Sequence, residues 1–210
     1  MKKGNINTIF STAYLPPIEY FYQLTKYRII YIDIYENYIK QTYRNRCYIY
    51  AANGKSSMSI PVIKTTGNHT QIKDIKIDYT QPWHRLHWRS IESAYNSSPF
   101  FLYFRDYLEP FYEKKYNFLI DLNTELLHVL IKLSGIISDV KFTENYIEPD
   151  EKINDFRNCI SPKSKTPTIS SFPQYTQVFG DKHGFIPNLS IIDLLFNEGK
   201  MCKEYLRPPV

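Results

Sequence analysis

The stretch YRIIYIDIY at residues 27–35 constrains the fold most strongly. Ile30, Ile32 and Ile34 occupy one side of an alternating pattern, and Asp33 lies on the other side. A period of two residues is typical of a β-strand with one buried face. We therefore expect a strand here, with Asp33 near its carboxyl end.

Further strands are expected on both sides of this one. They cover about 6–12, a hairpin within 44–62 that turns at Asn53-Gly54, an alternating run at 72–79, and a late strand in SDVKF at 138–142. Asn and Gly tolerate positive φ, which is why their pairing indicates the hairpin turn. Within the hairpin we expect residues 43–50 to form the first strand.

Helices are expected in the middle and near the end of the chain. Residues 81–98 place apolar and aromatic side chains at helical spacing. A second helix is expected to open at Ser98-Pro99 and to kink or end at Pro110. A third helix is expected to be capped by Asn123 and to end at Gly135. A last helix is expected between Ser190 and Gly199.

Strands that lead into helices, with a late return to strand, indicate an α/β fold built as a layered sheet with helices. A segregated α+β arrangement is the alternative. The length of 210 residues suits a single domain over 1–210. Residues 145–172 are polar and rich in Pro and Ser, so we expect a mobile surface loop or lid there.

The charge distribution points to an anionic ligand. Residues 1–60 hold eight Lys or Arg against three acids, so the whole formal net charge of +5 lies in that third of the chain. This favours a phosphorylated or nucleotide-linked small molecule as the partner. The excess is too small for duplex nucleic acid, which usually meets a larger basic face.

Other sequence features narrow the class. The three widely spaced cysteines and the lack of a CxxC motif indicate a reducing cytosol rather than a disulfide scaffold or a zinc site. No apolar run approaches the length of a membrane span, and no secretory signal is visible. The motifs G-x-G-x-x-G and G-x-x-x-x-G-K-[ST] are absent, so a Rossmann site or P-loop is not expected. The sequence does not indicate a particular cofactor.

The segment YIKQTYRNR at residues 38–46 is the most concentrated basic stretch. In a strand over 43–50, Arg44 and Arg46 point the same way, and with Lys40 nearby they form a clamp for phosphate or carboxylate. We therefore expect this stretch to bind substrate through Tyr38, Lys40, Arg44, Asn45 and Arg46. The alternative is an ordinary solvated strand face.

Asp33 is a candidate catalytic residue because ligands of open α/β sheets bind beyond the carboxyl ends of the strands. It would position a sugar hydroxyl, act as a general base or hold a metal. The alternative is that Asp33 pairs with a nearby Arg. Neither reading follows from the sequence alone.

The segment WHRLHW at 83–88 carries the second catalytic candidate. His84 is expected to act as a general base or as a hydrogen-bond donor to phosphate. Trp83 is expected to form a wall of the substrate pocket. The alternative for His84 is a half-buried side chain satisfied by a carbonyl. His84 and His87 lack further ligands at metal spacing, so no metal site is expected.

The C-terminal segments YTQVF and PNLS add candidate ligand contacts. Tyr175 and Gln177 share a face if the first segment is a strand, and Asn188 and Ser190 lie at the start of the last helix. A helix N-terminus offers free N–H groups to an anion. The alternative is plain helix capping.

Several stretches together resemble the WbqC-like family, which occurs with genes for O-antigen and other surface polysaccharides. They are AYLPPIEYF (13–21), YIDIYENYIKQTYRNR (31–46), SIPV (59–62), QPWHRLHWRSIESAYNSSPFF (81–101) and the run from YTQVF to FNEG (175–199). The first stretch adds Tyr14 to the expected substrate-binding residues. Ser11-Thr12 and Ile34 depart from the family pattern, which often has Gln-Pro and an acid there.

The resemblance implies a cytoplasmic transferase of polysaccharide biosynthesis that acts on a nucleotide-activated sugar or an acyl-type donor. In that hypothesis the basic clamp neutralises the phosphates of the donor, and Asp33 or His84 accepts a proton. The alternative hypothesis is a non-catalytic nucleotide-sugar binding module or partner subunit. Ligand binding would then survive the loss of Asp33 and His84.

Overall fold

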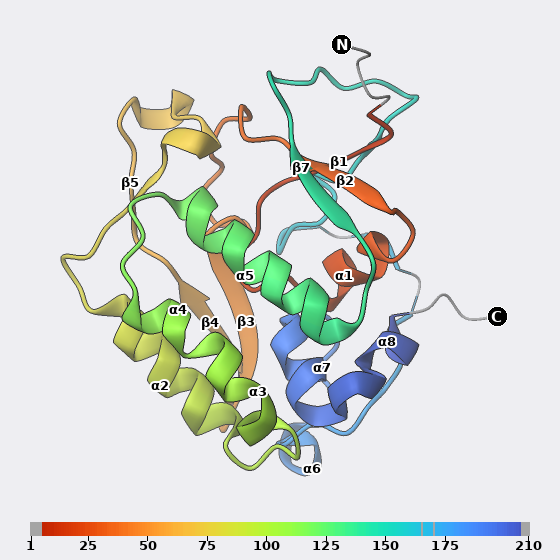
Figure 1. Cartoon of the computed structure of the whole chain (residues 1–210). Helices are drawn as coiled ribbons and strands as arrows, with labels where there is room; N and C mark the ends of the chain where they lie inside the picture. The colour runs from red at the N-terminus through yellow and green to blue at the C-terminus, as the bar shows by residue number, and fades with distance from the viewer. Residues whose placement is uncertain (1–5, 165, 170, 207–210) are drawn as a thin grey trace.

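A four-stranded parallel sheet places a group of buried polar residues at the ends of its strands. The structure is a computed structural model, and it describes residues 6–164, 166–169 and 171–206. The sheet has the order β7-β2-β1-β8, and it lies in the upper part of the molecule in Figure 1. Its strands are β1 (Thr8–Phe10), β2 (Ile29–Ile32), β7 (Asp139–Phe142) and β8 (Asn154–Asp155). The expected α/β architecture is confirmed.

Strand β2 confirms the alternation in the sequence. Ile30 and Ile32 are buried, and Ile9 and Phe10 of β1 pair beside them, with Ile9 opposite Tyr31. The crossover between these parallel strands contains helix α1 (Ile18–Leu24), as parallel pairing requires. Because β2 ends at Ile32, the next residue stands at the carboxyl edge of the sheet.

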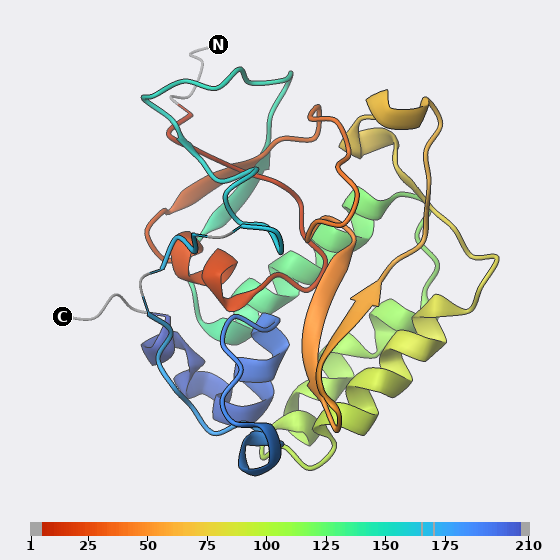
Figure 2. The ribbon, with the colours of Figure 1, turned by 180° about the vertical axis from the view of Figure 1, so that it is seen from behind.

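The stretch 145–172 is more than the surface loop expected from its composition. It contains β8, which pairs in parallel with β1 and completes the sheet. In Figure 2 the chain after β8 turns back toward the middle of the molecule. A strand of two paired residues is too short to show an alternating pattern. The sequence therefore did not predict β8.

A long β-hairpin forms a second layer. Strands β3 (Arg46–Ala51) and β4 (Gly54–Ser59) pair antiparallel, with Arg46 opposite Ser59 and Ala51 opposite Gly54. The hairpin is confirmed, but its turn residues are Ala52 and Asn53. Gly54 carries the positive φ of 95°, whereas Asn53 has negative φ. The first strand starts at Arg46, so the expected strand over 43–50 began too early.

A short ribbon follows the hairpin, formed by β5 (Val62–Ile63) and β6 (Lys76–Ile77). The run at 72–79 was expected to be an alternating strand with a possible bulge or late start, because its Ile residues are partly out of phase. The structure shows the late start: Ile72–Asp74 forms a 3₁₀ helix, and strand β6 begins only at Lys76. Ile72 and Ile75 are both buried. Their spacing of three residues matches a 3₁₀ turn, so helical rather than alternating periodicity decides this segment.

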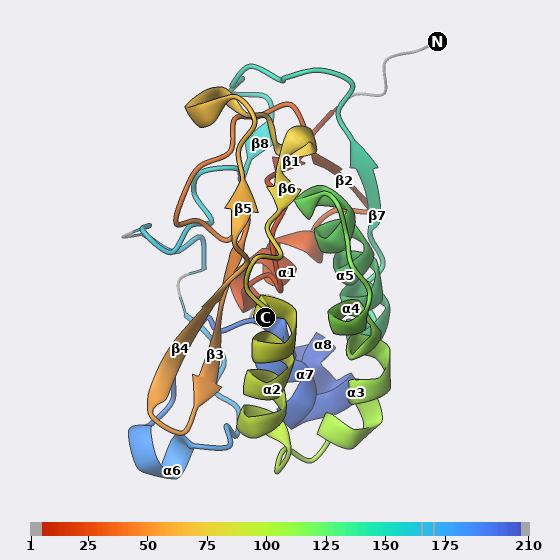
Figure 3. The ribbon, with the colours of Figure 1, turned by 90° about the vertical axis from the view of Figure 1, so that its left-hand side faces the viewer.

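The helices cover the hairpin and close the molecule around one core. They are α2 (Trp83–Tyr95), α3 (Phe101–Leu108), α4 (Pro110–Glu113), α5 (Leu119–Ser134), α6 (Gly180–His183), α7 (Ile191–Glu198) and α8 (Cys202–Tyr205). Helix α5 crosses the front of the molecule in Figure 1, and Figure 3 shows α2 beside the hairpin. Within the described residues, none of these helices has both the length and the apolarity to cross a membrane.

The capping and breaking residues in the sequence predicted most helix ends correctly and two helix starts wrongly. Pro110 separates α3 from α4, Gly135 caps α5 with φ of 68°, and Ser190 caps α7. Ser98 does not cap α3, which begins three residues later. Asn123 does not cap α5 either, because that helix already begins at Leu119 and holds Asn123 in its second turn.

Candidate functional site

The carboxyl ends of the four parallel strands bring polar side chains together at one edge of the sheet. Ser11 follows β1, Asp33 follows β2, Thr143 follows β7 and Arg157 lies two residues beyond β8. All four are buried. This is the edge where ligands of parallel sheets bind, as the sequence position of Asp33 predicted.

Arg157 is the centre of this cluster. Its Nη1 atom donates to Asp33 Oδ2 at 2.6 Å, and its Nε and Nη2 atoms donate to the carboxylate of Asp155. Asp33 Oδ1 accepts from the backbone N–H of Tyr35 at 3.0 Å and from the Thr143 hydroxyl at 3.1 Å. Both carboxylate oxygens of Asp33 are therefore engaged. The alternative reading of Asp33, as the partner of an Arg, is the one the structure shows.

Arg44 forms a second buried ion pair beside the first. Its Nε and Nη2 atoms donate to the two carboxylate oxygens of Glu36 at 2.9 and 2.5 Å, and Nη2 also approaches the carbonyl oxygen of Arg157 at 3.3 Å. Burial raises the pKa of Glu36, and the Arg44 guanidinium opposes that rise. The third nitrogen of Arg44, Nη1, donates no hydrogen bond within the described part of the chain.

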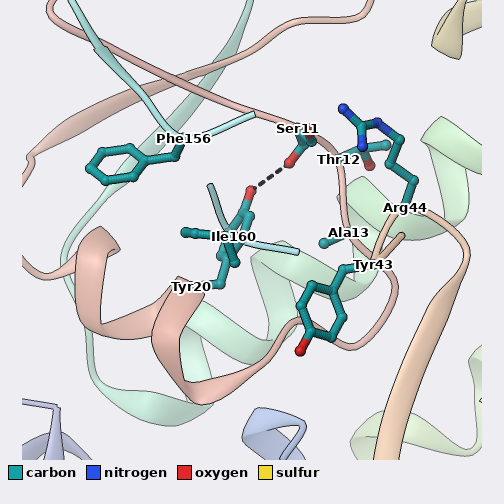
Figure 4. A pocket seen from close by; sticks show the side chains of 8 residues that line it. All are labelled: Ser11, Thr12, Ala13, Tyr20, Tyr43, Arg44, Phe156 and Ile160. Atoms are coloured by element: carbon teal, nitrogen blue, oxygen red, sulfur yellow. Dashed lines mark hydrogen bonds between the residues drawn. The ribbon is translucent and has the colours of Figure 1, made fainter. Parts of the chain in front are cut away.

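A small cavity lies next to Arg44. It is lined by Ser11, Thr12, Ala13, Tyr20, Tyr43, Arg44, Phe156 and Ile160. Figure 4 shows the Arg44 side chain rising beside Thr12, and the Tyr20 hydroxyl donating to the Ser11 carbonyl, whereas the Tyr43 hydroxyl points away. The centre of a water molecule has about 10 Å³ in which to move. This closed form therefore has room for about one water molecule.

Asn123 joins the cluster from helix α5. Its side-chain amide donates to Thr12 Oγ1 at 3.1 Å and to the Arg44 carbonyl oxygen at 2.8 Å. Its carbonyl oxygen Oδ1 is buried without a hydrogen-bond partner among the residues the structure describes. An unpaired buried acceptor costs free energy, so this atom is a candidate partner for a ligand or water.

The expected basic clamp is not assembled in the way the sequence suggested. Arg44 lies before β3 and is buried, whereas Arg46 begins β3, is half-buried and donates to the Ser59 hydroxyl at 2.9 Å. The two guanidinium groups therefore do not share a strand face. The reason is Glu36, which lies eight residues upstream and draws Arg44 into the interior.

The neighbours of the clamp have separate surroundings. The side chain of Asn45 donates to the Ile60 carbonyl at 2.7 Å. Burial raises the pKa of Tyr38 to about 12, and nearby Arg44 and Arg46 partly oppose this. Lys40 is exposed and lies beside Lys64, whose pKa is lowered by partial desolvation and by the Lys40 charge.

The first turn of α2 holds the second candidate group. His84 is half-buried, and desolvation together with the charges of Arg85 and Lys115 lowers its pKa. Its Nδ1 atom and the indole nitrogen of Trp83 are buried without hydrogen-bond partners among the described residues. The alternative of a His84 side chain satisfied by a carbonyl is therefore not met at Nδ1 within the described residues.

His87 and Tyr14 form a buried polar chain behind this turn. The Tyr14 hydroxyl lies 2.9 Å from His87 Nδ1 and 2.9 Å from the Tyr112 hydroxyl. Burial lowers the pKa of His87 to about 4, so its imidazole is neutral near pH 7. Tyr14 is completely buried. Its hydroxyl therefore serves the interior of the protein in this conformation.

The C-terminal candidates meet at a different place. The Tyr175 hydroxyl and the Gln177 amide both donate to Asp193 Oδ2, at 2.5 and 2.9 Å, although their segment is not a strand. Ser190 Oγ accepts from the N–H of Ile192 at the start of α7, which is the capping alternative.

Asn188 has φ of 53° and bonds to the backbone and carboxylate of Glu19. The four C-terminal candidates thus hold α7 and α1 in place, away from the edge of the sheet.

Sequence reasoning missed several residues of the cluster, among them Glu36, Asn123, Thr143 and Arg157. Arg157 lies in a stretch interpreted as a loop, and the available signal was the acid-base pair Asp155 and Arg157 two residues apart. Asn123 was interpreted as a helix cap. Within the described residues, no group of three or more His, Cys, Asp or Glu side chains is placed to hold a metal ion.

The chain is similar to the uncharacterized protein Rv1507c of Mycobacterium tuberculosis. The two are 29% identical over 206 residues, covering 85% of this chain and 87% of the relative. No solved structure matches the chain. Residues 12–170, which include Asp33, Glu36, Arg44, Asn123 and Arg157, match the WbqC-like protein family, and the chain belongs to that family.

Proposed function

We propose that this protein is a transferase of surface polysaccharide biosynthesis that binds a nucleotide-activated sugar, or an acyl-type donor, at the carboxyl edge of its parallel sheet. One observation carries the proposal. Side chains from the ends of all four strands converge beside a cavity on which Arg44 borders. This edge is the usual ligand position of parallel α/β sheets.

In this proposal Arg44 contacts the phosphate of the donor through Nη1, the nitrogen that no described residue uses. Glu36 holds the other two nitrogens, so the guanidinium is oriented before the ligand arrives. A pre-oriented guanidinium loses little conformational freedom on binding, which favours affinity. Arg157 has all three nitrogens bound to Asp33 and Asp155, and we assign it the role of fixing the edge.

The segment after β8 forms the cover of this site. Phe156 and Ile160 close the cavity from that segment. Thr168 fastens it to α1, because its backbone N–H donates to Glu19 and its hydroxyl accepts from Gln23 Nε2 at 2.8 Å. The closed cavity is too small for a nucleotide sugar, so admission of the donor requires Ile160 and Thr168 to move outward while Arg157 keeps the segment attached to the sheet.

His84 is the better candidate for proton transfer in this proposal. Its lowered pKa keeps the imidazole neutral near pH 7, and its Nδ1 atom has no described partner. A neutral imidazole with a free nitrogen is able to accept the proton of an acceptor hydroxyl. Asp33 has neither oxygen free, and its role is to hold Arg157.

The test is a thermal-shift screen with nucleotide sugars, free nucleotides, acyl-CoA, S-adenosylmethionine and inorganic phosphate. A ligand that binds the native state raises the melting temperature by mass action. The test variant is the double change Glu36→Leu with Arg44→Met, because replacing both members of a buried pair often preserves stability. We expect one donor class to stabilise the native protein and not the double variant. Arg46→Ala is the control and should keep the shift. An equal shift in all three proteins would contradict the proposal.

A second candidate function is a nucleotide-sugar binding module without chemistry of its own. The observation that favours it is the complete engagement of Asp33 by Arg157, Thr143 and the Tyr35 backbone. Phosphorus NMR of a bound donor with a panel of acceptor saccharides separates the two. Release of a nucleoside phosphate identifies a transferase, and a donor that binds but stays intact across the panel identifies a binding module.

A further inference from the structure

A surface groove lies outside the edge of the sheet, between the β5–β6 ribbon and the start of α5. It is lined by Ile63, Lys76, Ile77, Tyr79, Tyr116, Asn117 and Phe118, and its volume is about 360 Å³. Small-molecule sites typically measure about 300–1,000 Å³, so this groove has the size of a ligand site. The cavity beside Arg44 is far smaller in this conformation.

The aromatic walls of the groove are held firmly. The backbone N–H of Tyr116 donates to the Tyr79 hydroxyl at 2.9 Å, and the Tyr116 hydroxyl donates to Glu125 at 2.6 Å. Phe111 stacks on Tyr116 with an interplanar angle of 11°. Both hydroxyls are therefore occupied within the protein. The fixed rings can offer apolar surface to a flat ligand ring at little entropic cost.

One lining residue, Lys76, brings positive charge to the groove, and the Glu125 carboxylate lies at the Tyr116 hydroxyl. Lys76 and Asn117 are exposed at its surface, and none of the lining residues is acidic. The Lys115 ammonium lies 5.5 Å from the centre of the Tyr79 ring. Lysine ammonium groups attract anions without demanding one geometry, and the exposed Asn117 amide supplies donors and an acceptor. The ligand that fits combines hydroxyl groups, an apolar ring face and negative charge.

Two unsatisfied polar atoms lie against the same wall. The rings of Trp83 and His84 are each 5.7 Å from the Tyr79 ring. The indole N–H of Trp83 and Nδ1 of His84 have no partner among the described residues, although both atoms are buried. Buried polar atoms are paired in the great majority of cases. These two exceptions lie behind the Tyr79 wall, outside the residues that line the groove.

The groove is connected to the sheet edge through α5 and the 3₁₀ turn Ile72–Asp74. Phe118 precedes α5 and lines the groove, whereas Asn123 of the same helix bonds to Thr12 and Arg44. Five residues of helix span about 7.5 Å along the axis. The backbone N–H of Ile72 also donates to the Glu36 carbonyl at 3.0 Å. Helix α5 and the 3₁₀ turn therefore link the elements that line the two cavities.

We propose that the groove binds an acidic saccharide, a sugar carrying a carboxylate such as a uronic acid, with its ring on Tyr79 and its carboxylate at Lys76. Ile63, Lys76 and Asn117 leave the groove exposed along the surface. A chain of sugar residues can therefore continue beyond it. The binding stands on the groove alone, and the role of this saccharide as the acceptor rests on the proposed function.

The experiment is a calorimetric titration of the full chain with digalacturonate, with galactobiose as the neutral counterpart and uridine monophosphate as the nucleotide probe. We expect digalacturonate to bind at least about tenfold more tightly than galactobiose, a difference of about 1.4 kcal/mol. Lys76→Glu should remove that preference, because it places a carboxylate where the ligand carries one. Lys141→Glu, an equally exposed change on β7, should keep it.

Three outcomes would overturn the inference. They are the absence of digalacturonate binding, equal digalacturonate binding by the native protein and Lys76→Glu, and binding of uridine monophosphate that Lys76→Glu weakens. Tyr79→Leu gives a second check, because it removes the stacking face and should weaken digalacturonate binding while leaving donor binding unchanged. Donor binding is measured separately, as the thermal shift of the native protein compared with that of the Glu36→Leu, Arg44→Met variant. Failure of the groove and failure of the donor site are therefore separate results.

Discussion

At the residue scale, Arg44 shows that a local sequence signal can predict the wrong surroundings for a side chain. Its place in a basic cluster suggested an exposed clamp, but Glu36 lies eight residues earlier and both side chains are buried as a pair. Transfer of two charges out of water is expensive, and the pair is tolerated because each charge compensates the other. The same holds for Asp33 and Arg157.

The Glu36–Arg44 pair predicts that Glu36→Gln and Arg46→Ala differ greatly in their effect on the free energy of unfolding. Glu36→Gln leaves the Arg44 guanidinium buried without its counter-charge, and we expect a loss of about 3–5 kcal/mol in the free energy of unfolding. Arg46→Ala removes a half-exposed side chain and should change it by about 0.5 kcal/mol or less. Urea denaturation at pH 7 measures both. A small effect of Glu36→Gln would show that the pair is not buried in solution.

His87 gives a prediction about pH at the same scale. Its folded-state pKa of about 4 lies below the ordinary value of 6.5, so the folded protein favours the neutral imidazole. The stability that this contributes is present above pH 6.5 and is lost as the pH falls from 6.5 toward 4. At about 1.4 kcal/mol per pKa unit, the loss is about 3 kcal/mol.

His87→Gln isolates this contribution, because the other titrating groups are common to both proteins. We expect the difference in unfolding free energy between native protein and variant to shrink from pH 7 to pH 4.5 in urea titrations. The carboxyl groups of Glu36 and Asp193, whose pKa values are raised by burial, cancel in that difference. A constant difference across this range would mean that His87 titrates normally.

At the element scale, the helix ends are set by single residues. Gly135 caps α5 and Gly199 caps α7, and both have positive φ. These ends were visible in the sequence because a glycine past the last apolar residue is a local signal. The starts of α3 and α5 were not visible, because Phe100 and Phe118 precede them without any side-chain cap.

The two capping glycines predict different costs for the same substitution. Gly135→Ala meets only the end of Lys203 at 3.9 Å and should cost about 1–2 kcal/mol for the left-handed backbone. Gly199→Ala places a methyl group 2.8 Å from the Phe100 ring, and its φ of 58° with ψ of −133° is open almost only to glycine. We expect about 1–3 kcal/mol more for the overlap, measured by urea denaturation. Equal costs would mean that Phe100 moves aside freely.

At the scale of the whole molecule, β8 and Arg157 join the stretch 145–172 to the core. The strand completes the sheet beside β1, and Arg157 fixes it to the end of β2. Residues 148–152 before this attachment are exposed, whereas Ile160 and Ile169 after it are buried. The stretch therefore contains both exposed and anchored parts, which composition alone does not separate.

Limited digestion with trypsin tests this description. We expect the native protein to be cut after the exposed Lys152 and Lys163 and to resist cleavage after Arg157, which is 3% exposed. Asp33→Asn should make Arg157 a cleavage site, because it removes the charge that holds the guanidinium. Mass spectrometry of the fragments gives the answer. Early cleavage of the native chain after Arg157 would show that the segment is detached.

Features that depend on neighbouring residues could be predicted from the amino-acid sequence. The alternation of Ile30 and Ile32 defines a strand, the spacing of Trp88, Ile91 and Tyr95 defines the buried face of α2, and Gly199 ends α7. Periodicity and capping act over a few residues, so they can be read along the chain.

Only the tertiary structure decided which charges meet. Asp33 and Arg157 are 124 positions apart, and Asn123 reaches Thr12 across 111 positions. No local pattern encodes such a pairing, because it arises when four parallel strands end at one edge. The groove is likewise built from the β5–β6 ribbon and the segment before α5, and its walls meet only once the chain is folded.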